Sequence, residues 1–201
     1  MIYPDDSREE ALAARGYRWI AGVDEAGRGC LAGPVVASAV ILGEWRHPRI
    51  NDSKKLTPKM REFLYDEIMA HALAVGVGMV GEEEIDRINI LEASRLAMQI
   101  AVLQLKPGPD ALLLDAIQIE HPAHQVSLVH GDAVSISIAA ASIIAKVTRD
   151  RLMPALDQAC PGYDFTIHKG YGTARHLEAL TRLGPCRFHR KTFTPVRNLL
   201  Q

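Results

Sequence analysis

Short apolar segments with the character of β-strands recur along the chain, and they constrain the fold more than any other feature. The first two, residues 18–23 and 34–42, follow one another closely, and a third lies at 75–80. The last two, 111–116 and 126–130, come after a long helical pattern. Strands that first follow one another and then alternate with helices are typical of one mixed α/β sheet with helices packed on it. We therefore predict an α/β fold with a mixed five-stranded sheet flanked by helices.

Helical patterns lie between and after these strands. The expected helices span residues 57–72, 82–105, 132–152 and 173–183, with a further short helix inside 1–16. Thr57 and Pro58 form a helix start, because threonine caps a helix N-terminus and proline suits its first position. Pro154 is expected to end or kink the third of these helices.

Length and composition indicate an ordinary globular protein. A chain of 201 residues has the size of one domain, with a possible subdomain edge near residue 156. Its three cysteines form no CxxC pair, which argues against a disulfide scaffold or a thiolate zinc site and favours a reducing compartment. No long apolar run and no apolar signal region occur, so we expect no membrane span, no secretion and a cytoplasmic location.

Charge is distributed unevenly along the chain. Residues 166–201 contain seven Lys and Arg residues but one acidic residue, Glu178, whereas the preceding residues carry an excess of acids. A basic tail on an acidic body is typical of a protein that binds a polyanion and has a cation-binding cleft. Solubility alone explains the same distribution equally well, so charge does not decide between the two.

Two adjacent carboxylates, Asp24 and Glu25, end the first apolar strand. Inside a buried strand they are too costly unless they are paired or bind a cation. The alternative is a solvated strand end beside Arg28. Neighbouring side chains on a strand point to opposite faces, so both can serve one site only where the strand ends or bends. Gly27 permits such a bend.

Asp115 and Asp132 stand in similar positions, after the fourth and fifth strands. Each has an ordinary alternative, because aspartate is a favoured turn residue and a favoured helix cap. Taken with Asp24 and Glu25, they place four carboxylates at three strand ends, where open α/β sheets build their sites. Hard oxygen ligands without paired His or Cys point to Mg²⁺ or Mn²⁺. Two such ions about 4 Å apart can assist an in-line phosphoryl displacement.

Several loops offer candidate contacts to a nucleic acid. The glycines of Gly27-Arg28-Gly29 let backbone groups approach a ligand closely, and Tyr171 lies between glycines in a basic loop where it could stack on a sugar or base. An ordinary half-buried tyrosine is the alternative for Tyr171. Ser53 and Lys54 could bind phosphate, although a solvated turn explains them equally well. The GxGxxG match at 76–81 reads as a strand followed by glutamates, which argues against nucleotide binding there.

These stretches together resemble bacterial type II ribonuclease H (ribonuclease HII) over nearly the whole chain. The matching segments, in the family's order, are GVDEAGRG, LAGPVVASAVIL, NDSKKLTP, EEIDRINILEASRLAM, HGDAVSISIAAASIIAKVTRDR and HKGYGTARHLEALTRLGPCRFHR. The resemblance implies a ribonuclease H-like mixed sheet, with a catalytic core at about 17–155 and a helical, substrate-contacting C-terminal extension at about 156–201.

The resemblance also implies a role for each matching residue. It makes the four carboxylates Asp24, Glu25, Asp115 and Asp132 the ligands of two Mg²⁺ or Mn²⁺ ions. It places the ribonucleotide-reading backbone at residues 27–29 and the tyrosine that packs on the adjoining deoxyribose at Tyr171. Ser53, Lys54 and Lys169 are further expected contacts to the nucleic acid.

The implied activity is endonucleolytic cleavage of the RNA strand of RNA/DNA hybrids, including cleavage 5′ of a single ribonucleotide in duplex DNA, by a monomeric enzyme that acts in ribonucleotide removal. The products would carry 3′-hydroxyl and 5′-phosphate ends. Ala116 stands where many relatives have glycine, and His130 where lysine is common; neither change removes a ligand.

Three alternatives remain at this point. A type III ribonuclease H shares the fold but is disfavoured by the Tyr171 motif and by the lack of a separate N-terminal substrate-binding domain in this chain. A silent hybrid-binding protein would need a broken carboxylate set, whereas all four acids are present. A phosphatase acting on small substrates gives no reason for the basic tail.

Overall fold

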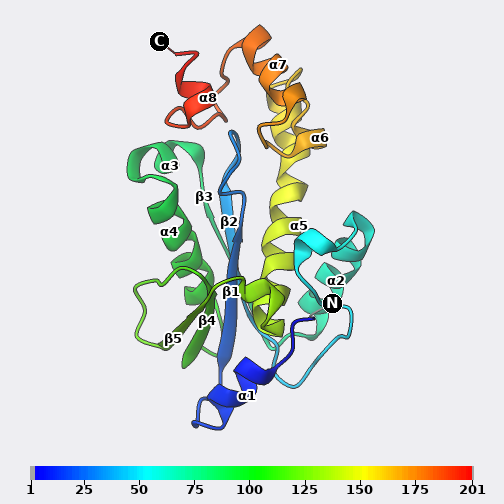
Figure 1. Ribbon diagram of the computed structural model, residues 1–201, viewed down its shortest axis with the longest axis vertical. Helices are drawn as coiled ribbons and strands as arrows, with labels where there is room; N and C mark the ends of the chain where they lie inside the picture. Colours follow the sequence, from blue (N-terminus) through cyan, green and yellow to red (C-terminus); the bar gives the residue numbers. More distant parts are fainter. Residues whose placement is uncertain (1–2, 201) are drawn as a thin grey trace.

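The computed structural model describes residues 3–200, and a five-stranded sheet lies at its centre. The strands are β1 (Ile20–Ala26), β2 (Val35–Ile41), β3 (Ala74–Val80), β4 (Ala111–Asp115) and β5 (His124–Leu128). Across the sheet their order is β3-β2-β1-β4-β5. β1, β2 and β3 pair antiparallel, whereas β4 pairs in parallel with both β1 and β5. The predicted mixed sheet is therefore confirmed, with β1 in the middle (Figure 1).

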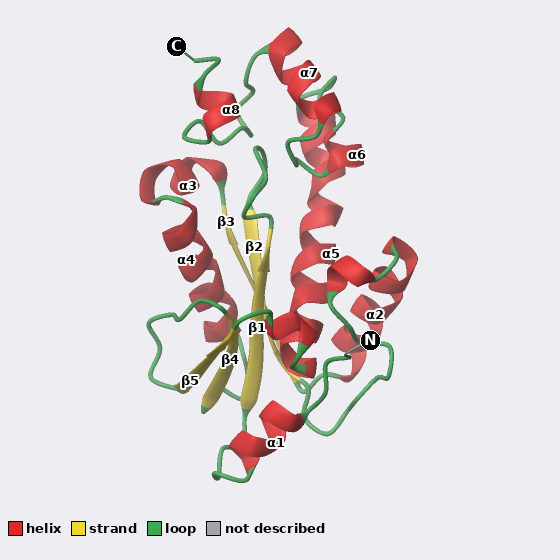
Figure 2. Ribbon diagram, in the orientation of Figure 1, coloured by secondary structure: helices red, strands yellow, loops and turns green. Residues whose placement is uncertain are grey.

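Helices cover both faces of this sheet (Figure 2). They are α1 (Ser7–Ala13), α2 (Pro58–His71), α3 (Glu82–Ile88), α4 (Ile90–Leu103), α5 (Ile136–Ala159), α6 (Phe165–His168), α7 (Ala174–Leu183) and α8 (Thr194–Arg197), with 3₁₀ turns at Ser53–Lys55 and Gly131–Ala133. Within residues 3–200, none of these helices combines the length and the apolarity that crossing a bilayer requires.

Successive side chains of β1 point to opposite faces of the sheet and pack against two different helices. Ala21 and Val23 belong to the apolar cluster that includes the buried face of α4. Gly22 faces α5 so closely that a Cβ there would lie 2.1 Å from the carbonyl carbon of Ser137. Since successive side chains of a strand alternate, Asp24 continues on the α5 side and Glu25 on the α4 side.

The prediction of one helix over residues 82–105 was wrong. Asn89 has a positive φ of 69° with ψ of 166°, which ends α3 and separates it from α4. The side-chain oxygen of Asn89 then accepts hydrogen bonds from the backbone N–H groups of Leu91 and Glu92, at 2.9 and 3.2 Å. Asparagine is a favoured helix cap, so one residue both ends the first helix and starts the second.

The predicted bounds of the helix after β5 were also wrong. α5 begins at Ile136 instead of Asp132, because Ser135 is its cap and accepts a hydrogen bond from the N–H of Ile138 at 3.2 Å. The helix continues through Pro154 to Ala159. Proline cannot donate to the carbonyl four residues earlier. That carbonyl, of Asp150, instead lies 3.5 Å from the ammonium of Lys169.

The C-terminal segment packs on the loop after β1 and on the far end of α5. Their shared apolar cluster includes Leu31, Met153, Phe165 and Leu180. Backbone hydrogen bonds join the same parts, from Leu31 N–H to the Gly170 carbonyl at 2.8 Å and from Arg190 N–H to the Leu31 carbonyl at 2.9 Å. The loop that follows Asp24 and Glu25 is therefore held by residues far along the chain.

Candidate active site

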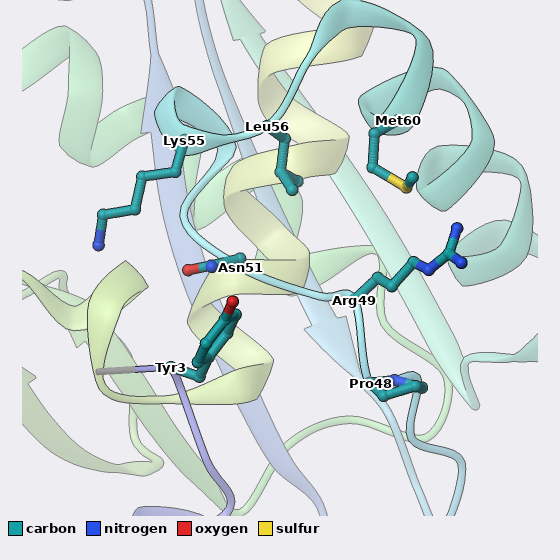
Figure 3. Close-up of a pocket in the computed structure, with 7 residues that line it drawn as sticks. All are labelled: Tyr3, Pro48, Arg49, Asn51, Lys55, Leu56 and Met60. Atoms are coloured by element: carbon teal, nitrogen blue, oxygen red, sulfur yellow. The ribbon is translucent and has the colours of Figure 1, made fainter. Parts of the chain in front are cut away.

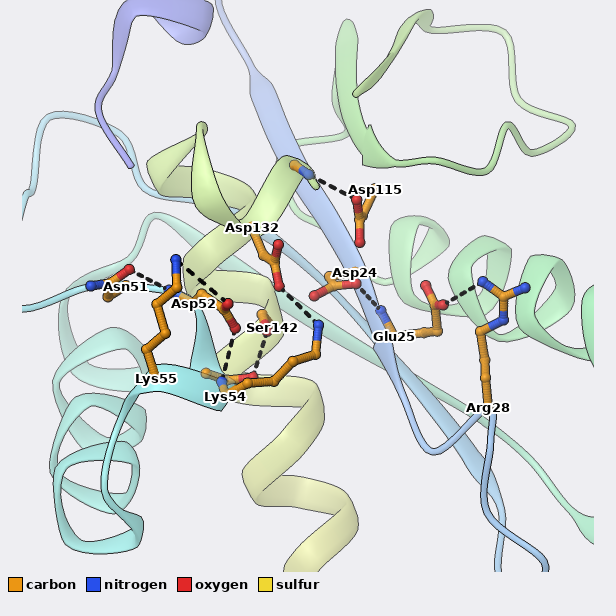
Figure 4. Close-up of polar contacts among 12 residues, drawn as sticks. Asp24, Glu25, Arg28, Asn51, Asp52, Lys54, Lys55, Asp115, Asp132 and Ser142 are labelled. Atoms are coloured by element: carbon orange, nitrogen blue, oxygen red, sulfur yellow. Dashed lines mark hydrogen bonds and ion pairs between the residues drawn. The ribbon is translucent and has the colours of Figure 1, made fainter. Parts of the chain in front are cut away.

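Three aspartates meet where the neighbouring strands β1 and β4 end. Val23 pairs with Leu114 across the parallel strands β1 and β4, so the next residues, Asp24 and Asp115, lie beside one another. Asp132 approaches from the 3₁₀ turn between β5 and α5. One carboxylate oxygen from each aspartate lies within 4.8 Å of the other two (Figure 4).

Asp132 does not cap α5, which removes the ordinary explanation for its presence. The cap is Ser135, and the carboxylate of Asp132 instead lies 3.1 Å from the ammonium of Lys54. The side chain of Asp132 is almost completely buried, whereas that of Lys54 is mostly exposed. The carboxylate of Asp132 therefore faces Lys54 and the other two aspartates instead of the end of α5.

Backbone groups orient two of these carboxylates. Oδ1 of Asp24 accepts a hydrogen bond from the N–H of Glu25 at 2.7 Å. Oδ1 of Asp115 accepts one from the N–H of Gly131 at 2.8 Å. Among residues 3–200, the Oδ2 atoms of Asp24 and Asp115 have no hydrogen-bonding partner on the protein. Each carboxylate thus keeps one oxygen fixed and one available.

Glu25 lies outside this group of three, as the alternation of the strand requires. Its Oε1 accepts a hydrogen bond from Arg28 at 3.1 Å. Its Oε2 is buried and has no partner in the described structure. A buried carboxylate oxygen without a donor is costly, and a bound cation would remove this cost.

The electrostatics of the cluster favour a bound cation. Burial raises the pKa of Asp24 well above its ordinary value, and the neighbouring carboxylates of Glu25 and Asp115 raise it further. Burial also raises the pKa of Glu25, although Arg28 opposes this rise. The pKa of Asp132 is raised by burial as well, against the effect of Lys54. A hard divalent cation fits such a set of oxygen donors and relieves the repulsion among them.

The cluster opens into a cavity of about 240 Å³ that collects most of the predicted site residues. Its lining comprises Asp24, Glu25, Ala26, Gly27, Arg28, Gly29, Ser53, Lys54, Asp115, Ser142, Lys146 and Tyr171. Lys169 does not line this cavity. It lines an adjoining groove, together with Tyr171 and Lys146. The hydroxyl of Ser53 is buried and shares a hydrogen bond of 2.7 Å with Ser142.

The comparisons with known proteins agree with this geometry. A family model described as Ribonuclease HII matches residues 21–196. A ribonuclease HII of Acholeplasma laidlawii is 56% identical over 194 residues, which cover 96% of each chain. The chain belongs to the ribonuclease HII family. A ribonuclease HII of Listeria monocytogenes is 53% identical over 190 residues, 94% of this chain and 73% of that protein. Membership of the ribonuclease HII family makes the chain a metal-dependent nuclease.

Solved structures confirm the ribonuclease H-like fold. The ribonuclease H2 of Pyrococcus horikoshii superimposes with a TM-score of 0.74 at 28% identity, covering 90% of this chain and 96% of that one. A ribonuclease HIII in complex with Mn²⁺ gives a TM-score of 0.70 at 20% identity, covering 90% of this chain and 69% of that one. The second likeness shows the fold alone, and the ribonuclease HII family model decides against the type III alternative.

Two buried arginines support the loops of this ribonuclease HII site, and sequence reasoning missed both. Arg149 donates to the backbone carbonyls of Ala32, Pro34 and Lys169 at 2.8–2.9 Å. Arg190 donates in the same way to Gly27, Arg28 and Gly33 at 2.7–3.0 Å. Both are fully buried. The two guanidinium groups thereby fix the backbone on which Arg28 and Tyr171 are mounted.

Lys146 is a third residue that the sequence did not single out. Its ammonium lies 2.8 Å from the carboxylate of Asp150 and 5.4 Å from the centre of the Tyr171 ring. It extends from α5 into the cavity that holds the carboxylates. The Lys–Asp spacing of four residues on a helix was the available signal, but surface pairs commonly have the same spacing.

A larger cavity of about 700 Å³ lies elsewhere, beside the segment before α2. It is lined by Tyr3, Pro48, Arg49, Asn51, Lys55, Leu56 and Met60 (Figure 3). None of these side chains is a carboxylate, so this cavity lacks the ligands that a divalent cation needs. The chemistry belongs to the smaller, acidic cavity.

Proposed function

We propose that the chain is an endonuclease that hydrolyses the RNA strand of RNA/DNA hybrids and also cuts on the 5′ side of single ribonucleotides in duplex DNA. The observation that carries this proposal is the shared cavity, in which the carboxylate cluster lies beside the glycine loop at residues 27–29 and Tyr171. A metal site, a close backbone approach and an exposed aromatic ring are the parts that junction recognition requires.

Asp24, Asp115, Asp132 and Glu25 are the residues that would hold two divalent ions, Mg²⁺ or Mn²⁺. The free Oδ2 atoms of Asp24 and Asp115 and the unpartnered Oε2 of Glu25 support this assignment. The chemistry supplied by such ions is activation of the attacking water and stabilisation of the leaving 3′-oxygen. The expected products therefore have 3′-hydroxyl and 5′-phosphate ends.

The chain's own loops would select the substrate. The backbone of Gly27-Arg28-Gly29 would contact the 2′-hydroxyl, the group by which a protein distinguishes RNA from DNA locally. The ring of Tyr171, which is 41% exposed, would pack on the sugar of the adjoining deoxynucleotide. Arg149 and Arg190 keep these two loops in a fixed relation through their bonds to backbone carbonyls.

The remaining contacts would be to phosphates. Lys54 lines the cavity and Lys169 lines the groove beside it. Ser53 would act indirectly, because its hydroxyl is already bonded to Ser142. Residues 156–201 would form the substrate-contacting extension of a single domain, and the enzyme would act as a monomer on RNA/DNA hybrid and on ribonucleotide-containing DNA.

The test is cleavage of a labelled DNA duplex that contains one ribonucleotide, with Mg²⁺, Mn²⁺ or EDTA. We expect a metal-dependent cut on the 5′ side of the ribonucleotide, and we expect Asp24→Asn to abolish it without unfolding the protein. A long RNA/DNA hybrid serves as the parallel substrate. Cleavage of the long hybrid alone would refute junction recognition and leave an activity of the type III kind. Cleavage of neither would refute the nuclease assignment.

A further inference from the structure

Three histidine rings gather beneath the loop that carries Tyr171. His168 ends α6, His176 lies in the first turn of α7, and His189 follows α7 in the loop that leads to Arg190. All three are buried. The rings of His168 and His176 stack with their centres 4.2 Å apart, and Nε2 of His176 lies 3.0 Å from Nε2 of His189.

Backbone donors determine where two of these rings carry their protons. The N–H of Cys186 donates to Nδ1 of His189 at 3.0 Å, so this nitrogen accepts and the proton of the neutral ring is on Nε2. The Cys186 sulfur also lies 3.2 Å from this Nδ1 and is then the donor of that contact. In the same way the N–H of Gly170 donates to Nδ1 of His168 at 3.2 Å. Nε2 of His168 then donates to the carbonyl of Tyr163 at 2.6 Å.

The tautomer of His176 follows from its neighbours. Nε2–H of His189 points at Nε2 of His176, which must accept. The proton of His176 is therefore on Nδ1, where it donates to the backbone carbonyl of Tyr171 at 2.9 Å. One continuous chain of hydrogen bonds thus runs from the Cys186 N–H through His189 and His176 to Tyr171.

This chain of hydrogen bonds requires both histidine rings to be neutral. A second proton on His176 would place two N–H donors face to face at 3.0 Å. Burial lowers the pKa of His176, and burial together with His176 lowers the pKa of His189 to about 4. The surrounding titratable groups offer no compensating charge. They are His168 from α6, Tyr163 and Cys186 from the loops, and Cys160 from the end of α5. The carboxylate of Asp157 in α5 interacts with His168, and no carboxylate among residues 3–200 forms an ion pair with His176 or His189.

We propose that His176 and His189 are positioning residues that hold the backbone of Tyr171 through this fixed chain of neutral tautomers. The inference rests on the proposed function, because it matters to the reaction only if Tyr171 contacts the substrate. Gly170 and Gly172 flank Tyr171, and Gly170 has φ of 80°. Backbone bonds already hold both sides of this residue, from the Tyr171 N–H to the His168 carbonyl at 2.9 Å and from the Thr173 N–H to the Tyr171 carbonyl at 2.8 Å. The bond from His176 is the side-chain contact that ties the same carbonyl to α7, at a position where the flanking glycines leave the backbone more freedom.

The tautomers can be measured directly by long-range ¹H–¹⁵N correlation spectra of the intact wild-type protein. We expect the Nδ1–H tautomer for His176 and the Nε2–H tautomer for His168 and His189, with no titration of His176 or His189 between pH 8 and about pH 5.5. An Nε2–H tautomer at His176, or titration of either ring near its ordinary pKa, would overturn the proposal. This measurement does not depend on activity.

A matched pair of variants tests the effect on the reaction. His176→Phe keeps a ring of similar size but removes the donor, whereas His176→Asn retains a donor near the position of Nδ1. We expect His176→Phe to raise KM for the one-ribonucleotide duplex roughly fivefold to tenfold, with kcat changed less than about twofold, and His176→Asn to restore most of the loss. Thermal melts confirm that each variant is folded.

A double variant shows whether the effect passes through Tyr171. In a Tyr171→Ala background, His176→Phe should cause no further rise in KM, because the group that it positions is already absent. An additive loss would show a general structural role and contradict the proposal. If the wild-type protein cuts the duplex and His176→Phe has the same KM, the positioning role is refuted and the proposed function stands. Wild-type protein that cuts neither substrate would refute the proposed function instead.

Discussion

Arg190 is expected to hold the glycine loop of the site in place, and its replacement tests this directly. Its guanidinium donates to three backbone carbonyls, those of Gly27, Arg28 and Gly33. In Arg190→Met these carbonyls lose their donors, and an unpaired buried acceptor costs about 1–3 kcal/mol. Removing a buried charge recovers part of this cost, so we expect a net loss of about 3–5 kcal/mol in the free energy of unfolding. A domain whose stability lies above the lower end of the ordinary range of about 5–15 kcal/mol remains folded after such a loss.

The assay is urea unfolding followed by tryptophan fluorescence, together with KM for the one-ribonucleotide duplex. Loosening of the loop should raise KM by about tenfold, because a loss of about 1.4 kcal/mol in binding free energy corresponds to that factor. Arg187→Met is the matched control, because Arg187 is a nearby basic residue that is exposed. A loss below about 1 kcal/mol for Arg190→Met with an unchanged KM would refute the reasoning.

Three further predictions concern the backbone and the carboxylates. Ala116 has φ of 59°, a conformation that favours glycine, so Ala116→Gly should raise the free energy of unfolding by about 0.5–1 kcal/mol in urea titrations; an unchanged or lower value would contradict this. Gly27 has φ of 94° and a Cβ there would lie 2.1 Å from Nε of Arg149, so Gly27→Ala should lower the melting temperature and the activity together, and a variant with wild-type values would show that the loop adapts. Because burial raises the pKa of Asp24 and Asp132, the stability that these carboxyls give the metal-free fold is complete below their unfolded pKa, near about pH 4, and is lost progressively as pH rises through their raised folded pKa. The metal-free protein should therefore lose stability as pH rises, and the increase in melting temperature caused by Mn²⁺ should grow with pH; an increment independent of pH would argue against the carboxylates as ligands.

Local sequence patterns predicted the sheet and the positions of three aspartates because these depend on neighbouring residues. Alternation and β-branched runs marked the strands, and Asp24 and Asp115 meet because parallel strands end at the same edge. Asp132 remained ambiguous, since a cap and a ligand look alike in sequence. The structure resolves this through Ser135, which occupies the cap position.

The support of the loops could not be predicted, because it depends on contacts between distant residues. Arg190 reaches loop carbonyls more than 150 positions away, and no local pattern announces such a bond. The histidine chain likewise joins α7 to the loop behind it through rings that are ordinary in sequence. Glu25 was expected to share a site with Asp24 only if the strand ends or bends beside them, and the structure keeps it outside the group of three aspartates, next to Arg28.

The central claim is that the aspartates at the strand ends form a divalent-cation site. The most direct measurement is Mn²⁺ binding, followed by electron paramagnetic resonance at fixed pH and without nucleic acid, for the wild type and Asp24→Asn. We expect the wild-type protein to bind Mn²⁺ and Asp24→Asn to lose most of that binding while keeping its fold. Equal Mn²⁺ binding by the two proteins would contradict the assignment of the site.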